Sequence, residues 1–448
     1  MQYNFNLFDI YGQLNKELAD FFDNKTIIGG SKYSKAKGYQ YSQHETLQLI
    51  EFVGASKFEK GEKDSEGVPK IYLNNSVFRA DVASKQMDID TKNIVFIPDD
   101  FSSDIACTIY RRKFKRFAKD NGLGNTLNDM VEDYPFYGSL VIKKVGKRFE
   151  IIDLNKLRNQ PDAKDLKSAS YVIIEHEMKM WEAQAMPNWD LSGLDYKWDD
   201  DITVFERYGR VPARFFDPSA DEKESIETVS FIAYDKKGKK VDSRLLFIEQ
   251  IEEKPFLEVH WKKRKGRWLG VGVIEENFEN QKARNAVFNM RMRSTLWSSK
   301  HIYQSSDESV GKNLVSEVRD GEVMYVTAGG QITPVNVQSQ GTNDFNTTED
   351  TIEKNADQRA FTYEVMTGEN MPSGTPFRLG VIMSESANSH FALKREKLAI
   401  LIKQVIYDFV FPDFYKSISK ESIEAIMHGE EDYQDLLDVV IKVKVVEF

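Results

Sequence analysis

The clearest long helical pattern of the chain covers residues 273–298. Apolar residues recur there at the spacing of one helix face, and two polar residues, Gln281 and Asn285, interrupt this stripe. Acidic residues precede basic residues along the segment, which is the order that the helix dipole favours. At about 1.5 Å per residue, the pattern predicts a helix roughly 40 Å long. The apolar members of the stripe are Ile274, Phe278, Phe288, Met292 and Leu296.

Two more long helices are predicted further along the chain. The first covers residues 347–367, and Asn346 or Thr347 can cap its start. The second covers residues 381–411 and ends before Pro412; its first half is small and polar, and its second half is strongly apolar. One face of the first of these helices carries Ile352, Ala356, Ala360 and Tyr363.

Two irregular segments separate the three helices. The segment 301–341 is polar and consists of short β-like runs, which predicts a small β-containing region. Residues 368–380, with the sequence GENMPSGTPFRLG, hold two prolines and several glycines, which break regular structure. The sequence therefore predicts a loop between the second and third long helices.

The first 272 residues show a mixed pattern. Amphipathic helices are predicted from Asp9, over 102–119 and near 125–134. Alternating runs around Gly146-Lys147 predict a β-hairpin, and further β-like runs follow at YVIIEHE and, three times, within 229–261. The final segment, LLDVVIKVKVVEF, is also typical of a strand. Together with the long helices, these patterns predict an α+β protein.

The helix over 102–119 carries a concentration of basic residues in its second half. One interpretation is a solvated face whose cations favour the helix C-terminus. The other is a surface for DNA or for a partner subunit. The basic residues are Arg111, Arg112, Lys113, Lys115, Arg116 and Lys119.

Composition narrows the classes of function. The chain has 448 residues and a formal net charge of −10, which argues against a protein that simply wraps nucleic acid. The single Cys107 excludes an internal disulfide and a cysteine zinc cluster. We expect no signal peptide, and the longest apolar run, Leu398–Ile402, is far shorter than the roughly 20 residues of a membrane span.

Sequence motifs for catalysis are missing. Gly270 and Gly272 lack the third glycine of a dinucleotide motif, and Gly311-Lys312-Asn313 lacks the serine or threonine of a phosphate loop. His176-Glu177 has no second histidine at zincin spacing. We therefore expect no enzymatic activity, catalytic residues, metal or cofactor, although scattered carboxylates can still meet in space, as they do in nucleases.

Several segments resemble the portal proteins of tailed bacteriophages. The segment 266–297, GRWLGVGVIEENFENQKARNAVFNMRMRSTLW, resembles the family's Gly-rich approach to a stem helix with a Gln…Asn pair, here Gln281 and Asn285. Residues 134–158 are similar to the family's wing β-region. The segments 202–212 and 370–380 resemble those of crAss-like phages of Bacteroidetes hosts in particular. The resemblance covers about 134–418, and the order of the elements is its most specific feature.

This resemblance implies a division of the chain into the regions of a portal subunit. Residues 1–272 correspond to the wing, 273–300 to the first stem helix, 301–341 to the clip and 342–367 to the second stem helix. The tunnel loop is expected at 368–380, the long wing helix at 381–411, and further wing at 412–448. Portals usually continue into a helical crown, which is absent or missing from this sequence.

The resemblance also implies a function and a set of partners. It predicts a homo-oligomeric ring of twelve subunits at the capsid vertex of the virion, assembled in the bacterial cytoplasm. Double-stranded DNA would pass through this ring during packaging and ejection, and the major capsid protein, terminase and neck or tail adaptor proteins would dock on it. No membrane is involved. The alternatives are another virion structural protein, such as a head–tail adaptor or capsid component, and a DNA-modifying enzyme.

The resemblance places the predicted tunnel loop against the passing DNA. Met371 is the only large apolar residue between Gly368 and Pro376, and no lysine or arginine occurs before Arg378. These features favour weak contacts with phosphates over a firm grip. An ordinary surface connection between two helices is the other interpretation. The loop residues are Gly368, Glu369, Asn370, Met371, Pro372, Ser373, Gly374, Thr375 and Pro376.

Overall fold

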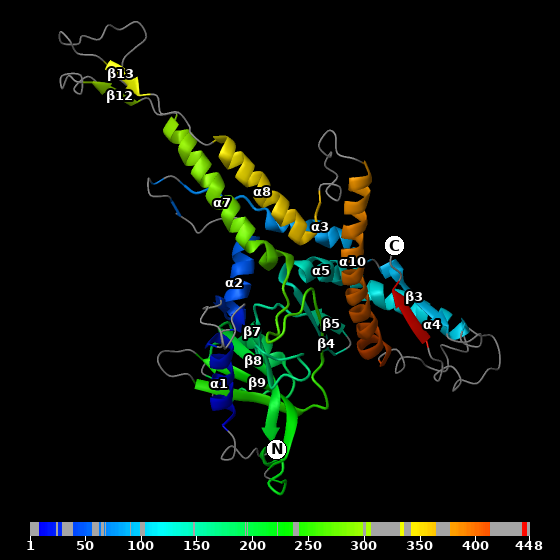
Figure 1. Ribbon diagram of the computed structural model, residues 1–448. Helices are drawn as coiled ribbons and strands as arrows, with labels where there is room; N and C mark the ends of the chain where they lie inside the picture. The colour runs from blue at the N-terminus through cyan, green and yellow to red at the C-terminus, as the bar shows by residue number, and fades with distance from the viewer. Residues whose placement is uncertain are drawn as a thin grey trace. The chain divides into compact units, whose positions relative to one another are not determined.

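The computed structural model describes most of the chain. Described are 9–298 with gaps at 24–25, 29–38, 56–61, 64–66, 68, 90, 99–103, 147, 193, 195, 222 and 236–241, then 302–305, 332–335, 342–363, 377–412 and 441–445. The chain forms two units (Figure 1). Unit 1 comprises Met1–Ala55, Ser76–Glu276 and Ala360–Phe448, and unit 2 comprises Ser56–Asn75 and Asn277–Arg359. Helices combine with antiparallel sheets, which confirms the predicted α+β class.

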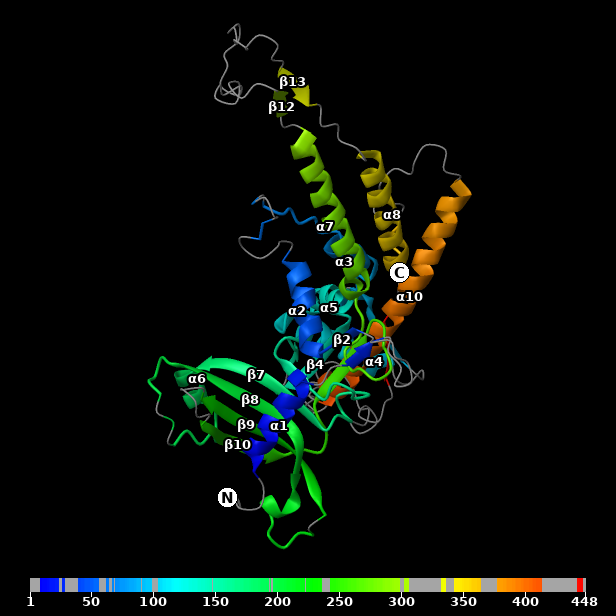
Figure 2. The same ribbon diagram turned by 60° about the vertical axis from the view of Figure 1, so that its left-hand side comes forward.

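A five-stranded antiparallel sheet forms the largest part of unit 1 (Figure 2). Its strand order is β10-β9-β8-β7-β6. Tyr171 and Ile173 on β7 face a core that includes helix α1 (Ile10–Asp23), while Val172 and Ile174 face a second core on the opposite side. Because both faces are buried at the start of β7, its first four residues form a continuous apolar run. The strands are β6 Leu157–Asn159, β7 Tyr171–Lys179, β8 Asp201–Pro212, β9 Ser225–Asp235 and β10 Asp242–Gln250.

A three-stranded sheet of order β11-β4-β5 adjoins the second core. Strands β4 (Ser139–Val145) and β5 (Arg148–Ile151) pair around Gly146, whose φ is 59°, which confirms the predicted hairpin. Strand β11 (Phe256–His260) pairs with the other edge of β4. The remaining short strands are β1 Thr26–Ile28, β2 Tyr39–Tyr41, β3 Ile94–Pro98 and β14 Ile441–Val445, where β14 pairs with β3.

Helices surround these sheets in unit 1. They are α2 (Gln43–Gly54), α3 (Ser76–Gln86), α4 (Asp104–Asp120), α5 (Leu123–Tyr137) and the short α6 (Met180–Ala185). Ser42 begins α2 with a capping box, because its hydroxyl accepts the Glu45 N–H and the Glu45 carboxylate accepts the Ser42 N–H. The predicted helices from Asp9, over 102–119 and near 125–134 are α1, α4 and α5. Helices α2 and α3 were not predicted.

The three long helices differ from expectation at their ends. Helix α7 covers Val273–Ser298, and α8 covers Thr342–Ala360. The expected end of α8 at residue 367 is wrong, because Phe361 has a left-handed φ of 56° and stops the helix; Tyr363 therefore lies outside it. Helix α10 covers Phe377–Val405 and continues into a π-helical turn over Ile406–Val410. Since α10 begins at Phe377 and not at residue 381, residues 377–380 of the predicted loop are helical.

Three glycines allow the chain to approach itself closely before α7. Gly138 ends α5 with a φ of 77°, and a Cβ on it would lie 2.2 Å from the Gly272 nitrogen. A Cβ on Gly270 would lie 2.1 Å from the Gly138 carbonyl oxygen. Only glycine fits at such backbone-to-backbone distances. The Gly-rich segment before α7 therefore serves packing and not phosphate binding.

A buried ionic cluster joins the five-stranded sheet and the three-stranded sheet of unit 1. The Glu206 carboxylate on β8 lies 2.5 Å from Lys143 Nζ on β4 and 2.8 Å from His176 Nε2 on β7, and it accepts the Tyr208 hydroxyl at 2.6 Å. Burial alone would raise the pKa of Glu206, but the His176 hydrogen bond and the Lys143 charge lower it to about 2. The carboxylate therefore stays ionised in the folded protein.

Replacing Gly272 by alanine is expected to destabilise unit 1 by about 1–3 kcal/mol. The added methyl group would lie 2.7 Å from the carbonyl oxygens of Pro135 and Phe136. Gly124→Ala is the matched control, because a Cβ there has nothing within 4 Å. Denaturant unfolding measures both variants, and equal stability of the two would contradict the close approach.

Glu206→Gln is expected to lower the free energy of unfolding by about 3–5 kcal/mol near neutral pH, because it leaves the Lys143 charge buried without its partner. The folded-state pKa of Glu206 lies below the unfolded value. Its contribution is therefore present above about pH 4.5 and is lost as the pH falls toward 2. Unfolding at several pH values should show the difference from wild type shrinking over that window. Glu177→Gln, an exposed position on β7, is the control and should show no such trend.

Candidate functional site on helix α7

Helix α7 buries the polar residues of its predicted stripe and exposes part of the apolar ones. Gln281 and Asn285 are 2% and 5% exposed, whereas Met292 and Leu296 are 37% and 41% exposed. Ile274 is buried, and Phe278 and Phe288 are half-buried. The chain therefore covers the stripe in its first half and at its two amides, and leaves its C-terminal end exposed. The predicted packing of the whole stripe as a stem helix stays a prediction.

The buried amides of α7 bind an extended segment of the chain, residues 71–75, which we call the strap. The Asn289 side chain accepts the Ile71 N–H at 2.9 Å and donates to the Ile71 carbonyl at 2.8 Å. Asn285 accepts the Leu73 N–H at 2.9 Å. Gln281 accepts the Asn75 N–H at 2.7 Å and donates to the Leu73 carbonyl.

The spacing of these contacts follows from the geometry of the two backbones. Four residues of α-helix rise about 6 Å, and two residues of extended chain span about 6.6 Å. The strap runs antiparallel to the helix. The amides at positions 289, 285 and 281 can therefore bind strap residues 71, 73 and 75, one residue each. We call this arrangement the amide ladder. It gives the strap the hydrogen bonds that a neighbouring strand would otherwise supply.

Helix α8 contacts α7 through ion pairs. Arg284 lies 2.6 Å from Glu353 and 3.6 Å from Glu349, and Arg291 lies 2.8 Å from Glu349. Arg291 also donates to the Asn346 side chain at 3.0 Å. Of the described α8 residues within unit 2, Ala356 alone is fully buried. Polar contacts therefore dominate this helix pair.

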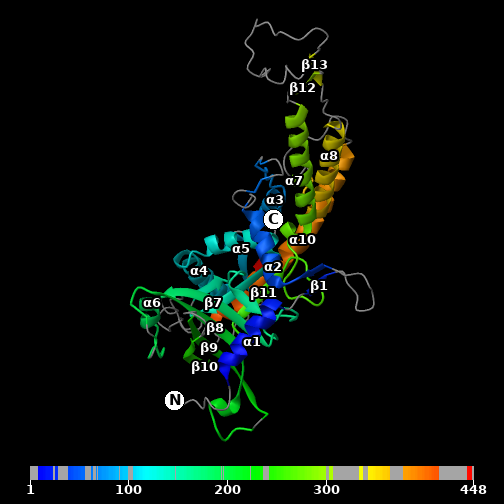
Figure 3. The same cartoon turned by 90° about the vertical axis from the view of Figure 1, so that its left-hand side faces the viewer.

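Three large apolar side chains near the C-terminal end of α7 are exposed. Met290 is 58% exposed, and Met292 and Leu296 are also exposed. A short hairpin follows this end of the helix, in which β12 (Ile302–Ser305) pairs antiparallel with β13 (Ile332–Val335) (Figure 3). The rest of the segment 301–341 lies outside the described residues, as do all nine predicted tunnel-loop residues, Gly368 to Pro376.

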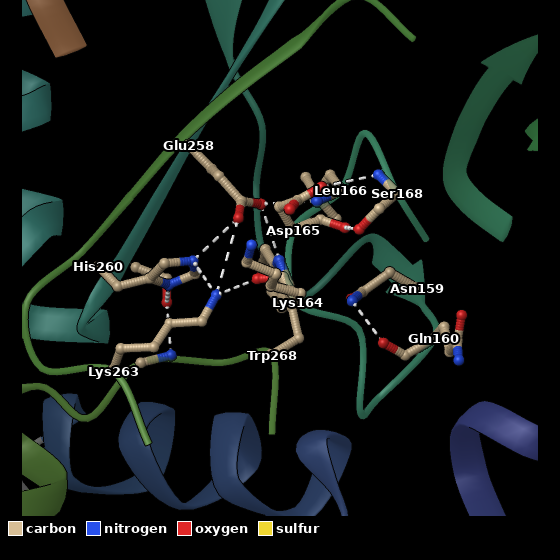
Figure 4. A network of polar contacts seen from close by, with 12 residues as sticks. Asn159, Gln160, Lys164, Asp165, Leu166, Ser168, Glu258, His260, Lys263 and Trp268 are labelled. Carbon is tan, nitrogen blue, oxygen red and sulfur yellow. Dashed lines mark hydrogen bonds and ion pairs between the residues drawn. The ribbon is translucent and has the colours of Figure 1, made fainter. Parts of the chain in front are cut away.

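A second polar network, in unit 1, has the groups of a hydrolase triad. Figure 4 shows the Glu258 carboxylate turned toward His260 and Lys263. Glu258 lies 3.1 Å from His260 Nε2, and His260 Nδ1 lies 2.9 Å from the Ser139 hydroxyl. However, Ser139 is 1% exposed, and its oxygen already accepts the Gly270 N–H at 2.7 Å. This serine has no room to attack a substrate.

The remaining contacts of this network are structural. The second Glu258 oxygen accepts the Leu166 N–H at 3.1 Å and the Trp268 indole N–H at 2.8 Å. Lys263 donates to the Lys164 carbonyl at 2.5 Å. Burial lowers the pKa of His260 despite the Glu258 carboxylate. The network thus fixes the loop before α7 on the three-stranded sheet.

Neither the family models nor the curated proteins that were compared with this chain give a match. Within the described residues, no three or more His, Cys, Asp or Glu side chains are arranged to hold a metal ion. None of the helices in that part of the chain is both long enough and apolar enough to cross a membrane. The amide ladder and the exposed C-terminal end of α7 are the features of unit 2 that bear on function.

Part of the amide ladder was visible in the sequence. Gln281 and Asn285 were identified as polar interruptions of an apolar stripe, but Asn289, which continues the same i, i+4 spacing, was missed. The strap was missed as well, because its side chains carry no helical or alternating pattern. A row of amides at four-residue spacing is the signal that could have indicated a bound backbone.

Asn285→Ala is expected to release the strap, because the half-buried Leu73 N–H loses its acceptor at a cost of about 1 kcal/mol. Hydrogen exchange of a peptide covering 70–75 measures this directly, and the protection seen in wild type should fall. Lys282→Ala, an exposed position on the same helix, should leave the exchange unchanged. Unaltered protection in Asn285→Ala would contradict the ladder.

Proposed function

We propose that this chain is a subunit of the portal ring of a tailed bacteriophage, of the kind found in crAss-like phages. The observation that carries the proposal is α7, a long helix whose polar side is occupied within the subunit while Met290, Met292 and Leu296 remain exposed at its outer end. Exposed apolar residues gathered on one helix favour an interface with another chain. A ring supplies that interface through repeated contacts between neighbouring subunits.

The order of elements supports the same proposal. Helix α7 leads into the β12–β13 hairpin, the chain returns in α8, and α10 follows after the segment 364–376. The corresponding portal regions are the first stem helix, the clip, the second stem helix, the tunnel loop and the long wing helix. In this proposal the clip docks terminase and neck or tail proteins, and the wing contacts the major capsid protein.

The charge of the chain fits a conduit for DNA better than a DNA-binding protein. A ring of twelve subunits would carry a net charge of 12 × −10, or −120. Repulsion from the phosphates would then weaken static binding. We propose that DNA slides past the tunnel loop with weak contacts and that the ring catalyses no reaction. Its place is the portal vertex of the virion, and it assembles in the host cytoplasm.

The purified chain is expected to form closed rings with a central channel, visible by negative-stain microscopy and by mass measurement in solution. Met292→Asp with Leu296→Asp should reduce the ring fraction by about tenfold or more, since a carboxylate buried in an apolar contact costs more than 1.4 kcal/mol. Lys282→Asp, exposed on the same helix, is the control and should assemble normally. A wild-type chain that remains monomeric or dimeric at every concentration would contradict the proposed function.

A further inference from the structure

Helix α4 presents a basic stripe that unit 1 leaves uncovered. Its inner side packs through Tyr110 and Phe114 against Phe96 of β3 and Phe411, which follows α10. On the opposite side, basic residues occupy positions i, i+3, i+4 and i+7, which share one helix face. All four are exposed, and Arg116 lies 3.7 Å from Asp120, one turn further along the same helix. The basic stripe consists of Arg112, Lys115, Arg116 and Lys119.

Unit 1 also contains an acidic cleft of about 530 Å³. Its carboxylates come from α2, from α5 and from the residues after β5: Glu51, Asp129, Glu132, Asp133 and Asp153. No lysine, arginine or histidine lines this cleft in the described part of the chain. The Glu51 carboxylate, on α2, accepts hydrogen bonds from the Tyr137 hydroxyl at 2.5 Å and from the Asn155 side-chain amide at 2.9 Å. The described lining of the cleft therefore holds several carboxylates and no positively charged side chain.

The crowding of these carboxylates has an energetic cost. Burial raises the pKa of Asp133, and the four neighbouring carboxylates raise it further, to about 6. A cation placed in the cleft would relieve this repulsion. The four cations on one helix face are opposite in sign to the five carboxylates of the cleft.

The stripe and the cleft are carried by different elements of the same unit. In the views of Figures 1, 2 and 3, α5 lies between α2, which carries Glu51, and α4, which carries the stripe. None of the residues that line the cleft comes from α4. A contact between two different patches on two copies is heterologous, and its repetition closes into a ring or extends into a filament.

We propose that the basic stripe of α4 docks in the acidic cleft of the neighbouring copy of this chain. This inference rests on the proposed ring and names one of its interfaces. Both patches occur once in every subunit, so each cleft receives one helix. DNA is the other polyanion that the stripe could meet, but the chain's net charge of −10 opposes it. The contact would be salt-dependent, because both patches are exposed.

Charge reversal tests the contact without touching the core, since the chosen residues are exposed. The stripe variant is Lys115→Glu with Arg116→Glu, and the cleft variant is Asp129→Lys with Glu132→Lys. Each alone should lower the ring fraction by about tenfold or more, because like charges then face each other. The control for the stripe variant, Arg264→Glu with Lys265→Glu, makes the same change in net charge as that variant at another exposed site and should assemble as wild type does.

Recombining the two variants provides the decisive measurement. The chain with all four substitutions should regain rings, and so should an equimolar mixture of the two variants, because each reversed stripe then meets a reversed cleft. Unfolding temperatures identify any variant that fails for lack of folding. Normal rings in both variants, or no recovery in the quadruple variant and the mixture, would overturn the contact while leaving the proposed function intact.

Two other outcomes also decide the matter. A stripe variant that assembles normally but loses salt-dependent association with double-stranded DNA would assign the stripe to DNA and overturn the contact. A wild-type chain that forms no ring under any condition would overturn both the contact and the proposed function.

Discussion

The backbone of the strap needs hydrogen-bond partners, and the amides of α7 provide them. A buried N–H or C=O without a partner costs about as much as a lost hydrogen bond. Residues 71–75 form no strand ladder, and Asn75 is buried. Gln281, Asn285 and Asn289 satisfy this segment from the helix. This requirement explains why a long helix of an ordinary α+β protein carries polar residues on its covered side.

The same constraint determines where the apolar residues of α7 are found. One side of the helix is occupied by the strap, and α8 is held through Arg284 and Arg291. The large side chains of Met290, Met292 and Leu296 are then left on the surface. A helix with apolar residues on every side would associate without specificity. The contacts of α7 with the strap and with α8 are thus mainly polar, and its exposed apolar residues lie toward its C-terminal end.

Sequence periodicity predicted the class of the fold and the existence of its long helices. It failed where backbone conformation or contacts between distant residues determine the ends of a helix or the packing of a segment. The apolar runs of β7 and the hairpin at Gly146 are local signals, and the structure has both. The end of α8 depends on the left-handed φ of Phe361, which no periodicity indicates. The start of α2 could have been predicted, because Ser42 and Glu45 have the spacing of a capping box.

The candidate site was only partly predictable for a related reason. A hydrophobic stripe is interpreted as a buried face because burial of apolar area usually dominates packing. On α7 that assumption fails along the length of the stripe, since Leu296 near the C-terminal end is exposed and Asn285 in the middle is buried. The sequence does hold the correcting signal, because amides that repeat every four residues match the two-residue repeat of an extended chain. A polar interruption of that period is therefore better interpreted as a binding surface for backbone than as a defect in an apolar stripe.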